Sequence, residues 1–595
     1  MSASAPPRPR ARPQQPPSYR HGPRRPRRPD SRYRLSVVLI VILFVLTLVA
    51  GKLLELQGLN RSAYSAMAER QRLHTVTLTA PRGAILDRDG QPLAETVDAR
   101  DIYADPKEVV DAQKTATQLA PLLGDTAASL LPALTAKSSF QYLARAVTPT
   151  LPSQVIGLQL PGIGSLPTTK RIYPDGVLAS NLLGYVHWDG NGAAGLESAF
   201  QKILAGHDGT QTFEAGAAGA PIPDGHDVVE QAQPGTSLQL TIDRDLQWEA
   251  QQAIAAQVKA VKADSGTVVV MDPRTGRLLA LAVAPGFDAN NPPTAITAGQ
   301  RQLDPAASDI YEPGSVNKVI TMSAGLQEGL VTPNSPFVIP PQLHYAGTIF
   351  NDAEKHGTER LTLTGILAKS SNIGTIEVAQ RLGANKLYSY LRAYGFGSVT
   401  GTGLPGEQDG ILPPVSQWWR TTMPTVAFGQ GIGVTALQVA SVYSTIANGG
   451  VRVAPNIIAA TIDSSGHKHP AAAPATRRVI SAKVAHELSD MLESVTTNEG
   501  TAPAARVPGY RIAGKTGTAQ RAVNGHYSGY TATFVGFAPA DKPQLVVEVV
   551  LQNPRSGHFG GVVAAPVFHD VMAFALQSLG IAPTGTRPPK ARLTW

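Results

Sequence analysis

The sequence predicts an α/β protein that combines a sheet-and-helix domain, an N-terminal pedestal domain and one N-terminal transmembrane helix. Two observations predict this arrangement. A single uncharged apolar run stands near the N-terminus. Strand-like runs stand near both ends of the C-terminal portion with helical patterns between them, which is typical of an antiparallel sheet covered by helices. With 595 residues and 43% hydrophobic content, the chain can form several domains with buried cores.

The N-terminal segment predicts a membrane anchor. Residues 1–34 contain ten Arg, nine Pro and one acidic residue, which predicts a disordered tail. Leu35–Gly51 carries no charge, and the leucines that follow extend it to a transmembrane helix over residues 35–56. Because arginines precede the span, the tail is expected in the cytoplasm and the rest of the chain outside the membrane. A cleaved signal peptide is the alternative, but the run ends without a small-residue cleavage site.

Composition excludes several classes of function. The net charge is +8, but residues 1–34 carry +9, so the basic character belongs to the tail and does not indicate binding of nucleic acid. The chain has no Cys, which excludes disulfide scaffolds, thiolate zinc sites and Cys nucleophiles. His486 and Glu487 begin like a metalloprotease motif, but Asp490 stands where the second His ligand belongs. We therefore expect no metal site.

The exported part is expected to contain two domains. A breaker-rich stretch, Ala215–Gly235, marks the region of the boundary. The expected segments are a pedestal over 57–230, a larger domain over 231–582 and a C-terminal tail over 583–595. In the larger domain the expected strands are Ser237–Asp243, two arms of a hairpin over Gly266–Val283, Thr531–Pro539 and Pro543–Pro554. The expected helices there are Asp245–Val261, capped by Asp, and Ala564–Gly580.

The first chemical motif is an S-x-x-K sequence, Ser315 to Lys318. Pro and Gly precede it, and the residues after it have helical spacing, so Ser315 is expected at the start of a helix with Lys318 one turn on. A neutral Lys beside a Ser can take its proton, and the positive end of the helix favours the developing charge. Taken alone, the motif favours an ordinary helix cap, because Ser is a common N-cap residue and Lys a common helix residue.

Two further motifs follow in the chain. Ser370 and Asn372 form an S-x-N sequence between two helical patterns, for which a helix cap is the simple structural alternative. Lys515, Thr516 and Gly517, followed by Thr518, form a K-T-G-T sequence. Its structural alternative is a tight turn, and its functional interpretation is a strand edge where Gly517 lets a substrate backbone approach.

The order S-x-x-K, S-x-N, K-T-G is what raises three weak signals to a strong one. With these motifs the sequence resembles the class B penicillin-binding proteins, the monofunctional peptidoglycan D,D-transpeptidases, over nearly its whole length. The pedestal segments PRGAILDRDG, RIYPDGVLASNLLGYV and GAAGLESAF also match that family. The Arg/Pro-rich tail and the segments YLARAV and WDGNGAAGLE look most like the actinobacterial cell-division (FtsI-like) type. The resemblance implies a β-lactamase-like transpeptidase domain over 231–582 and a dimerisation-like pedestal.

The resemblance also implies roles for the motif residues. Ser315 would attack the penultimate D-Ala carbonyl of a stem peptide and form an acyl-enzyme, with Lys318 as its base. Ser370 would relay the proton to the leaving amine, and Asn372 would hold Lys318 and the substrate amide. The terminal carboxylate would bind Lys515, Thr516 and Thr518 beside Gly517, and the backbone N–H groups of Ser315 and Thr518 would form the oxyanion hole. β-Lactams would acylate the same serine.

Partners and alternatives follow from the same resemblance. It implies no cofactor and no metal, and it implies a SEDS-type (FtsW-like) glycan polymerase and other divisome membrane proteins as partners, because no glycosyltransferase motif is found in the pedestal. Two alternatives remain open: a D,D-carboxypeptidase or β-lactamase that uses water as the acceptor, and a β-lactam sensor or scaffold. Arg555 and His558 are expected to decorate a turn.

Overall fold

The computed structural model describes residues 31–59, 67, 72–148, 150–214, 222, 224–292, 303–523 and 525–595. The chain divides into two compact units, residues 1–76 with 211–229 and residues 77–210 with 230–595. Most of the predicted tail, residues 1–30, lies outside the described residues.

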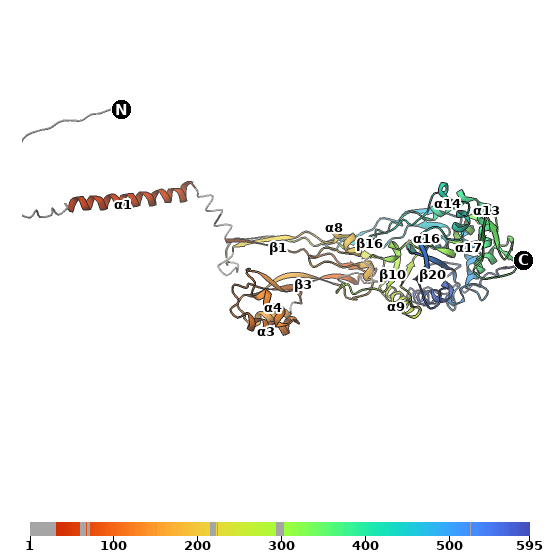
Figure 1. Ribbon diagram of the computed structural model, residues 1–595, viewed down its shortest axis with the longest axis horizontal. Helices are drawn as coiled ribbons and strands as arrows, with labels where there is room; N and C mark the ends of the chain where they lie inside the picture. Colours follow the sequence, from red (N-terminus) through yellow and green to blue (C-terminus); the bar gives the residue numbers. More distant parts are fainter. Residues whose placement is uncertain are drawn as a thin grey trace, which may run out of the picture. The chain divides into compact units, whose positions relative to one another are not determined.

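The first unit contains the predicted membrane helix. Helix α1 (Ser31–Leu54) continues into a π-helical turn, η1 (Glu55–Leu59) (Figure 1). The stretch Arg32–Gln57 is long and apolar enough to cross a membrane, with a mean hydropathy of 2.9 over its most apolar window. The prediction of disorder is wrong for residues 31–34, which form the first turn of α1, because Arg has a high helix propensity and extends a helix that the apolar run stabilises. Strands β1 (Leu73–Leu78), β6 (Gly209–Glu214) and β7 (Asp227–Glu230) form a three-stranded sheet.

The second unit contains a five-stranded antiparallel sheet of order β10-β9-β21-β20-β19. Its strands are β9 (Ser265–Met271), β10 (Leu278–Ala284), β19 (Ala513–Val523), β20 (His526–Ala538) and β21 (Leu545–Gln552). One face is covered by α9 (Arg244–Val261) and α19 (Ala565–Ser578), and the other by α16 (Ala436–Ala447). The predicted hairpin and the two predicted strands near the C-terminus are therefore confirmed, as is the antiparallel sheet covered by helices.

Alternation along the central strands creates two hydrophobic cores. Val547 and Val549 of β21 pack in one core with Phe568 of α19, whereas Val546 and Val550 pack in the other with helix α16. Successive strand side chains point to opposite faces, and helices cover both faces, so β9 and β21 are buried along their whole length.

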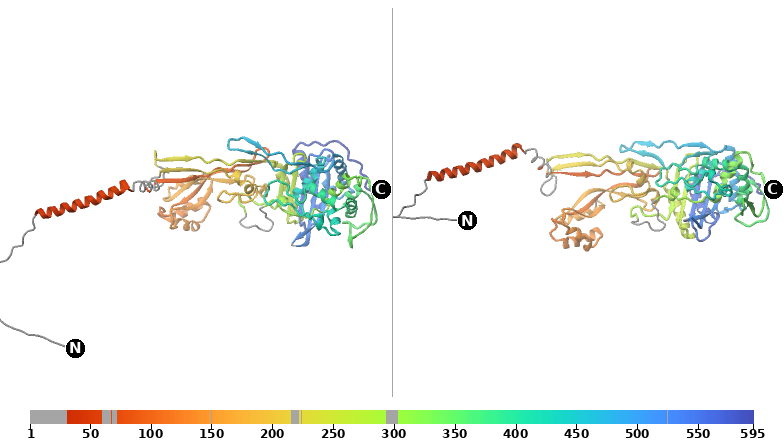
Figure 2. Two further views of the ribbon diagram at one scale, coloured as in Figure 1. Left: turned by 90° about the horizontal axis from the view of Figure 1, so that it is seen from above. Right: turned by 45° about the horizontal axis from the view of Figure 1, so that its top comes forward.

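Helices and small sheets form a lobe on the α16 side of the sheet (Figure 2). The helices there are α10 (Pro305–Ser308), η2 (Gly314–Asn317), α11 (Lys318–Gln327), α12 (Leu363–Lys369), α13 (Asn372–Leu382), α14 (Ala384–Tyr394), η3 (Val415–Gln417), α15 (Thr422–Ala427) and α17 (Ala482–Glu493). The short helices η4 (Ser494–Thr496), η5 (Pro503–Ala505) and α18 (Gly560–Val563) contribute buried residues to the core that contains α19. The strand pairs are β11 (Pro336–Ile339) with β14 (Glu359–Thr362), β12 (Leu343–Tyr345) with β13 (Thr348–Phe350), and β15 (Val451–Val453) with β18 (Thr476–Arg478).

A second sheet joins segments from both sides of the predicted domain boundary. It has the order β17-β16-β8-β2-β3-β4, with β5 paired to β3. Its strands are β2 (Ile85–Leu86), β3 (Pro92–Ala104), β4 (Gln141–Val147), β5 (Ile163–Ile172), β8 (Ser237–Leu240), β16 (Ile458–Ile462) and β17 (Lys468–Pro470). The predicted strand after residue 236 therefore exists as β8, but it pairs in parallel with β2 of the pedestal, Ile85 opposite Leu238. Helices α3 (Ala112–Leu123), α4 (Ala127–Leu134) and α5 (Thr150–Gly157) pack beside β3, β4 and β5.

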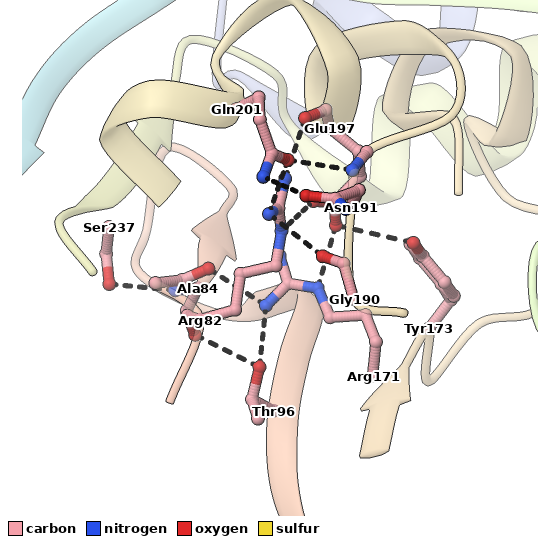
Figure 3. A network of polar contacts seen from close by, with 12 residues as sticks. Arg82, Ala84, Thr96, Arg171, Tyr173, Gly190, Asn191, Glu197, Gln201 and Ser237 are labelled. Carbon is pink, nitrogen blue, oxygen red and sulfur yellow. Dashed lines mark hydrogen bonds and ion pairs between the residues drawn. The ribbon is translucent and has the colours of Figure 1, made fainter. Parts of the chain in front are cut away.

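The three family-like pedestal segments meet at one buried carboxylate. Glu197, in α7 (Gly195–Ala199), is fully buried. Its carboxylate oxygens form ion pairs with Arg82 Nε at 2.5 Å and with Arg171 Nε at 2.7 Å (Figure 3). Arg171 also donates to the carbonyl of Gly83 at 2.8 Å and to the Thr96 hydroxyl at 3.2 Å. The network ties the loop before β2 to the end of β5. The short helices α6 (Ser180–Leu183) and α8 (Gln201–Leu204) flank α7.

Candidate active site

Ser315 lies on a tight turn that leads into a buried helix. It belongs to the 3-10 turn η2, and α11 begins at Lys318. Gly314, Val316 and Asn317 around it are buried, whereas Ser315 is partly exposed. Its hydroxyl makes no hydrogen bond to any residue that the structure describes. A partly exposed serine hydroxyl can be reached by a substrate, but the structure does not join Ser315 to Lys318 by the hydrogen bond that links a nucleophile to its base.

The turn is held against the sheet by glycines. Gly314 has a φ of 56°, and a Cβ there would lie 3.2 Å from the Cβ of Ala519 on β19. A Cβ on Gly517 would lie 2.1 Å from the Thr533 hydroxyl and 3.1 Å from the carbonyl of Pro313. The space that a Cβ on Gly517 would need is therefore filled by the protein, which gives this glycine a packing reason; the approach of a substrate backbone along the strand edge stays a prediction.

The Ser370 hydroxyl lies between two buried lysines. Lys515 Nζ donates to Ser370 Oγ at 2.9 Å, and Lys318 Nζ donates to Ser370 Oγ at 3.2 Å and to the Ser370 carbonyl at 2.5 Å. Both lysine side chains are fully buried. The structure thus brings one residue of each motif together, although 145 residues separate Ser370 from Lys515 in the chain.

Burial alters the protonation of both lysines. Burial lowers the pKa of Lys318 to about 7, against the opposing charge of Asp352. Burial, and then the charge of Lys318, lowers the pKa of Lys515 well below the ordinary value of 10.5. Near neutral pH a neutral amine is therefore accessible in this cluster, and a neutral amine can accept a proton from a serine hydroxyl.

The S-x-N segment forms the junction between two helices. Ser370 ends α12 in the left-handed conformation, with a φ of 60°, and Ser371 caps α13 by accepting from the Gly374 N–H. The Asn372 side-chain amide donates to the carbonyl of Asn351 at 3.0 Å. The resemblance implied a contact of Asn372 with Lys318. In the structure the amide donates instead to Asn351, which lies on the loop after β13.

Asp352 is a site residue that sequence reasoning missed. Its carboxylate accepts from the Ser371 hydroxyl at 2.7 Å, from the Asn372 N–H at 2.5 Å and from the Ile373 N–H at 3.0 Å. A carboxylate at the first turn of α13 satisfies N–H groups that the helix leaves without partners. No motif marks Asp352 in the sequence, since its position is set by the fold of the β12–β13 segment rather than by spacing from Asn372.

The K-T-G-T segment lies on β19, the edge strand of the five-stranded sheet. Lys515 faces the helical lobe, as Gly517 does, and the two threonines alternate with them. The Thr516 hydroxyl lies 2.9 Å from the Thr501 hydroxyl, and Thr518 Oγ1 accepts from the Gly560 N–H at 3.1 Å. Thr501 is a second residue that sequence reasoning missed, because it lies in an irregular segment outside the three motifs.

The remaining predicted residues have other partners. Arg555 pairs with Asp264 at 2.5 Å, and His558 stacks on the Tyr530 ring with centroids 4.4 Å apart, both in the irregular segment after β21. His486 lies 3.7 Å from Asp490 on α17. Among the described residues no cluster of His, Asp and Glu could hold a metal ion.

Known proteins are similar to this chain in sequence and in domain arrangement. Residues 77–240 match the penicillin-binding protein dimerisation domain, and residues 266–573 match the penicillin-binding protein transpeptidase domain. Penicillin-binding protein PbpB of Mycolicibacterium smegmatis is 37% identical over 578 residues, covering 90% of this chain and 89% of that protein. Peptidoglycan D,D-transpeptidase FtsI of Escherichia coli is 33% identical over 562 residues, covering 93% of this chain and 92% of that protein.

Solved structures extend the likeness to the fold. Penicillin binding protein 3 of Mycobacterium tuberculosis, solved in complex with aztreonam, is 32% identical, with a TM-score of 0.69, and the match covers 87% of this chain and 100% of that chain. A peptidoglycan synthetase from Bifidobacterium adolescentis gives a TM-score of 0.71 at 33% identity, covering 88% of this chain and all of that one. The chain therefore belongs to the class B penicillin-binding proteins, the peptidoglycan D,D-transpeptidases that pair a dimerisation domain with a transpeptidase domain.

Proposed function

We propose that this enzyme crosslinks peptidoglycan stem peptides through an acyl-enzyme on Ser315 and serves septal wall synthesis in cell division. The observation that carries the proposal is the Ser370 hydroxyl held between Lys318 and Lys515, both fully buried, in the domain that carries Ser315. The cell-division role is supported by the relatives of the FtsI and PbpB type.

In the first half-reaction the neutral amine of Lys318 takes the proton of Ser315. The Ser315 oxygen then bonds to the carbonyl carbon of the penultimate D-Ala, and the backbone N–H groups of Ser315 and Thr518 stabilise the oxyanion. The C–N bond breaks, and the leaving D-Ala amine receives a proton through Ser370. Because both lysines donate to Ser370 Oγ, the hydroxyl proton of Ser370 is left for the leaving group.

The second half-reaction reverses these steps with a different amine. An amine of a neighbouring stem peptide loses its proton to Ser370 and attacks the acyl carbon. The ester bond to Ser315 then breaks, and the Ser315 oxygen takes back a proton from Lys318. The terminal carboxylate of the donor binds to the edge strand, at Lys515, Thr516 and Thr518. Gly517, between them, leaves room for the turn that carries Ser315. Asn372 orients the substrate amide from the start of α13. β-Lactams, which the M. tuberculosis relative binds, acylate the same Ser315.

The test is labelling of the full chain with fluorescent penicillin. The wild-type protein is expected to form a covalent band, and Ser315→Ala is expected to lose it. Ser389→Ala, which changes an exposed serine on α14, is the matched control and should label like wild type. A folded wild-type protein that never labels would favour a scaffold role.

Labelling does not distinguish a crosslinking enzyme from a hydrolase that shares the acyl-enzyme. Incubation with a peptidoglycan precursor distinguishes them by product. A crosslinked dimer together with released D-Ala supports the transpeptidase, whereas D-Ala released without any dimer supports a D,D-carboxypeptidase.

The protein is a membrane protein with one apolar N-terminal helix, and its orientation is part of the proposal. The N-terminal arginines lie in the cytoplasm, and the transpeptidase domain, residues 231–582, lies outside the membrane on a pedestal over residues 57–230. Glycan strands are supplied by a SEDS-type (FtsW-like) polymerase together with other divisome membrane proteins. A reporter active only outside the cytoplasm, fused after residue 595, should be active; an inactive reporter would overturn the orientation.

A further inference from the structure

The segment 590–595 packs against the helical lobe of the transpeptidase domain. Thr594 forms an antiparallel bridge with Leu361 on β14. The Trp595 indole N–H donates to the carbonyl of Phe337 at 3.0 Å, and the Arg360 guanidinium lies 5.3 Å from the Trp595 ring centroid. The predicted C-terminal tail is thus docked on the β11–β14 pair. Figure 1 shows this end of the chain beside the lobe that contains α13.

The same segment holds the residue that caps α12. Thr362 is fully buried, and its N–H donates to the carbonyl of Leu593 at 3.0 Å. Its hydroxyl donates to the carbonyl of Arg592 at 2.5 Å and accepts from the Gly365 N–H at 3.1 Å. The proton of the capping hydroxyl is therefore directed at the segment 590–595, which leaves its oxygen oriented toward the first turn of α12.

A glycine in that first turn admits the segment. A Cβ on Gly365 would lie 2.0 Å from the carbonyl oxygen of Leu593. Because glycine weakens a helix relative to alanine, its presence in α12 requires a reason. The reason is the close approach of the Leu593 backbone.

The C-terminal end of α12 lies at the candidate active site, because Ser370 ends the helix. The helix runs from Leu363 to Lys369, and Ser370 ends it, so about 12 Å of helix, at 1.5 Å per residue, separates Thr362 from Ser370. Ser370 places its hydroxyl between Lys318 and Lys515. A short helix moves as a unit, so a shift of its first turn shifts Ser370 against the two lysines.

We propose that the segment 590–595 is a positioning element for the acylation reaction, which acts through Thr362 and helix α12 to place the Ser370 hydroxyl between Lys318 and Lys515. This inference rests on the proposed function of the site. The segment touches none of the reacting groups, so it sets the rate of the chemical step rather than the first binding of the donor.

The test measures acylation of the full chain by fluorescent penicillin and separates the dissociation constant of the non-covalent complex from the acylation rate constant. Deletion of residues 590–595 is expected to lower the rate constant on the order of tenfold, because small displacements of catalytic groups slow a reaction strongly, with the dissociation constant unchanged within about twofold. Gly365→Ala, which displaces Leu593 without shortening the chain, is expected to give the same loss. Gly357→Ala, at a glycine with open space around it, is the matched control.

The double variant gives the decisive comparison. Once residues 590–595 are deleted, Gly365→Ala meets no carbonyl, so the double variant should acylate no more slowly than the deletion alone. Unchanged acylation in the deletion or in Gly365→Ala overturns the proposal. The proposal is also overturned if the affinity for penicillin, the acylation rate constant and the thermal stability all fall together, since the segment would then only stabilise the fold. A wild-type protein that does not acylate contradicts the proposed function instead.

Discussion

The Tyr311 hydroxyl donates a 2.7 Å hydrogen bond to the carboxyl group of Glu548, inside the core behind the nucleophile turn. Glu548 is fully buried in the middle of β21, and Tyr311 precedes Ser315 by four residues. The second carboxyl oxygen of Glu548 has no hydrogen-bond partner in the described part of the chain. A buried carboxyl group beside neutral groups is held in its protonated form, because burial penalises the charged form.

The first prediction concerns the protonation of Glu548. Burial raises the pKa of Glu548 well above its ordinary value of 4.5. The folded protein therefore holds this proton more firmly than the unfolded chain does, and the free energy of unfolding falls as pH rises above the ordinary Glu range. Glu548→Gln keeps the shape and the acceptor for Tyr311 but cannot ionise. We expect its free energy of unfolding to fall less than that of wild type between pH 5 and pH 8, as measured by urea denaturation.

A companion variant tests the hydrogen bond itself. Glu548→Leu leaves the buried Tyr311 hydroxyl without an acceptor, which is expected to lower the free energy of unfolding by about 1–3 kcal/mol at pH 5. Adding Tyr311→Phe to Glu548→Leu removes the unsatisfied donor and should restore part of this loss. Equal pH dependence in wild type and Glu548→Gln would contradict a protonated Glu548.

The second prediction concerns the pH dependence of acylation. Burial lowers the pKa of Lys318 to about 7, and only its neutral form can accept the Ser315 proton. The second-order acylation rate should therefore rise with pH and level off above about 7, falling about tenfold per pH unit well below that value. Stopped-flow measurement with fluorescent penicillin between pH 5.5 and 8.5 gives the profile. Lys318→Arg, whose guanidinium stays protonated, should abolish acylation at every pH, and residual activity with the same profile would rule Lys318 out as the base.

The sequence pattern predicts individual hairpins and helices, but it does not predict which distant strands pair with one another. The hairpin of β9 and β10 and the cap of α9 at Asp243 depend on residues within a few positions, so turn and capping chemistry predicts them. The pairing of Ile85 with Leu238 joins strands 153 residues apart, and no periodicity specifies which distant strand completes a sheet. The boundary after residue 230 stays a prediction, and β8, the first strand after it, pairs with β2 from the segment before it.

The same distinction applies to the site. The three motifs predict Ser315, Lys318, Ser370 and Lys515 as site residues because the spacing within each motif is short and their order is informative, and the structure joins Ser370 to both lysines. Asp352 escaped prediction because it reaches the S-x-N segment from another loop, and an isolated Asp in a loop resembles any other turn residue. Gly517 has a packing reason that the motif does not reveal, because the hydroxyl of Thr533, on a neighbouring strand, occupies the space that a Cβ would need.

The third prediction concerns Asp352. Its charge raises the pKa of Lys318 against the effect of burial, and its oxygens cap α13. Asp352→Asn removes the charge but keeps an acceptor oxygen, so the pH profile of acylation should move to lower pH with little loss of stability. Asp352→Ala should show the same direction of shift and lose about 1 kcal/mol of unfolding free energy with the cap. An unchanged pH profile of acylation in both variants would show that Asp352 serves only to hold the S-x-N segment and does not affect the pKa of Lys318.

The fourth prediction concerns the buried carboxylate of the pedestal, Glu197. Its two oxygens pair with Arg82 and Arg171, both of which are nearly inaccessible to solvent (Figure 3). Glu197→Gln leaves two buried guanidinium groups without a countercharge, and removing one partner of a buried ion pair costs about 3–5 kcal/mol. We expect a drop of that size in the unfolding free energy of the full chain, followed by far-UV circular dichroism in urea.

Two control variants, one at the surface and one in the core, show how large the stability loss of Glu197→Gln is. Glu487→Gln, on α17, disrupts only a loose pair with the exposed Lys483 at 3.9 Å and should change stability by less than about 0.5 kcal/mol. Replacing Glu197, Arg82 and Arg171 together by Leu, Met and Met removes all the charges at once and should recover part of the loss, because no buried charge is then left unpaired. If Glu197→Gln is as mild as Glu487→Gln, the ion pairs do not hold the pedestal segments together, and packing around α7 alone must do so.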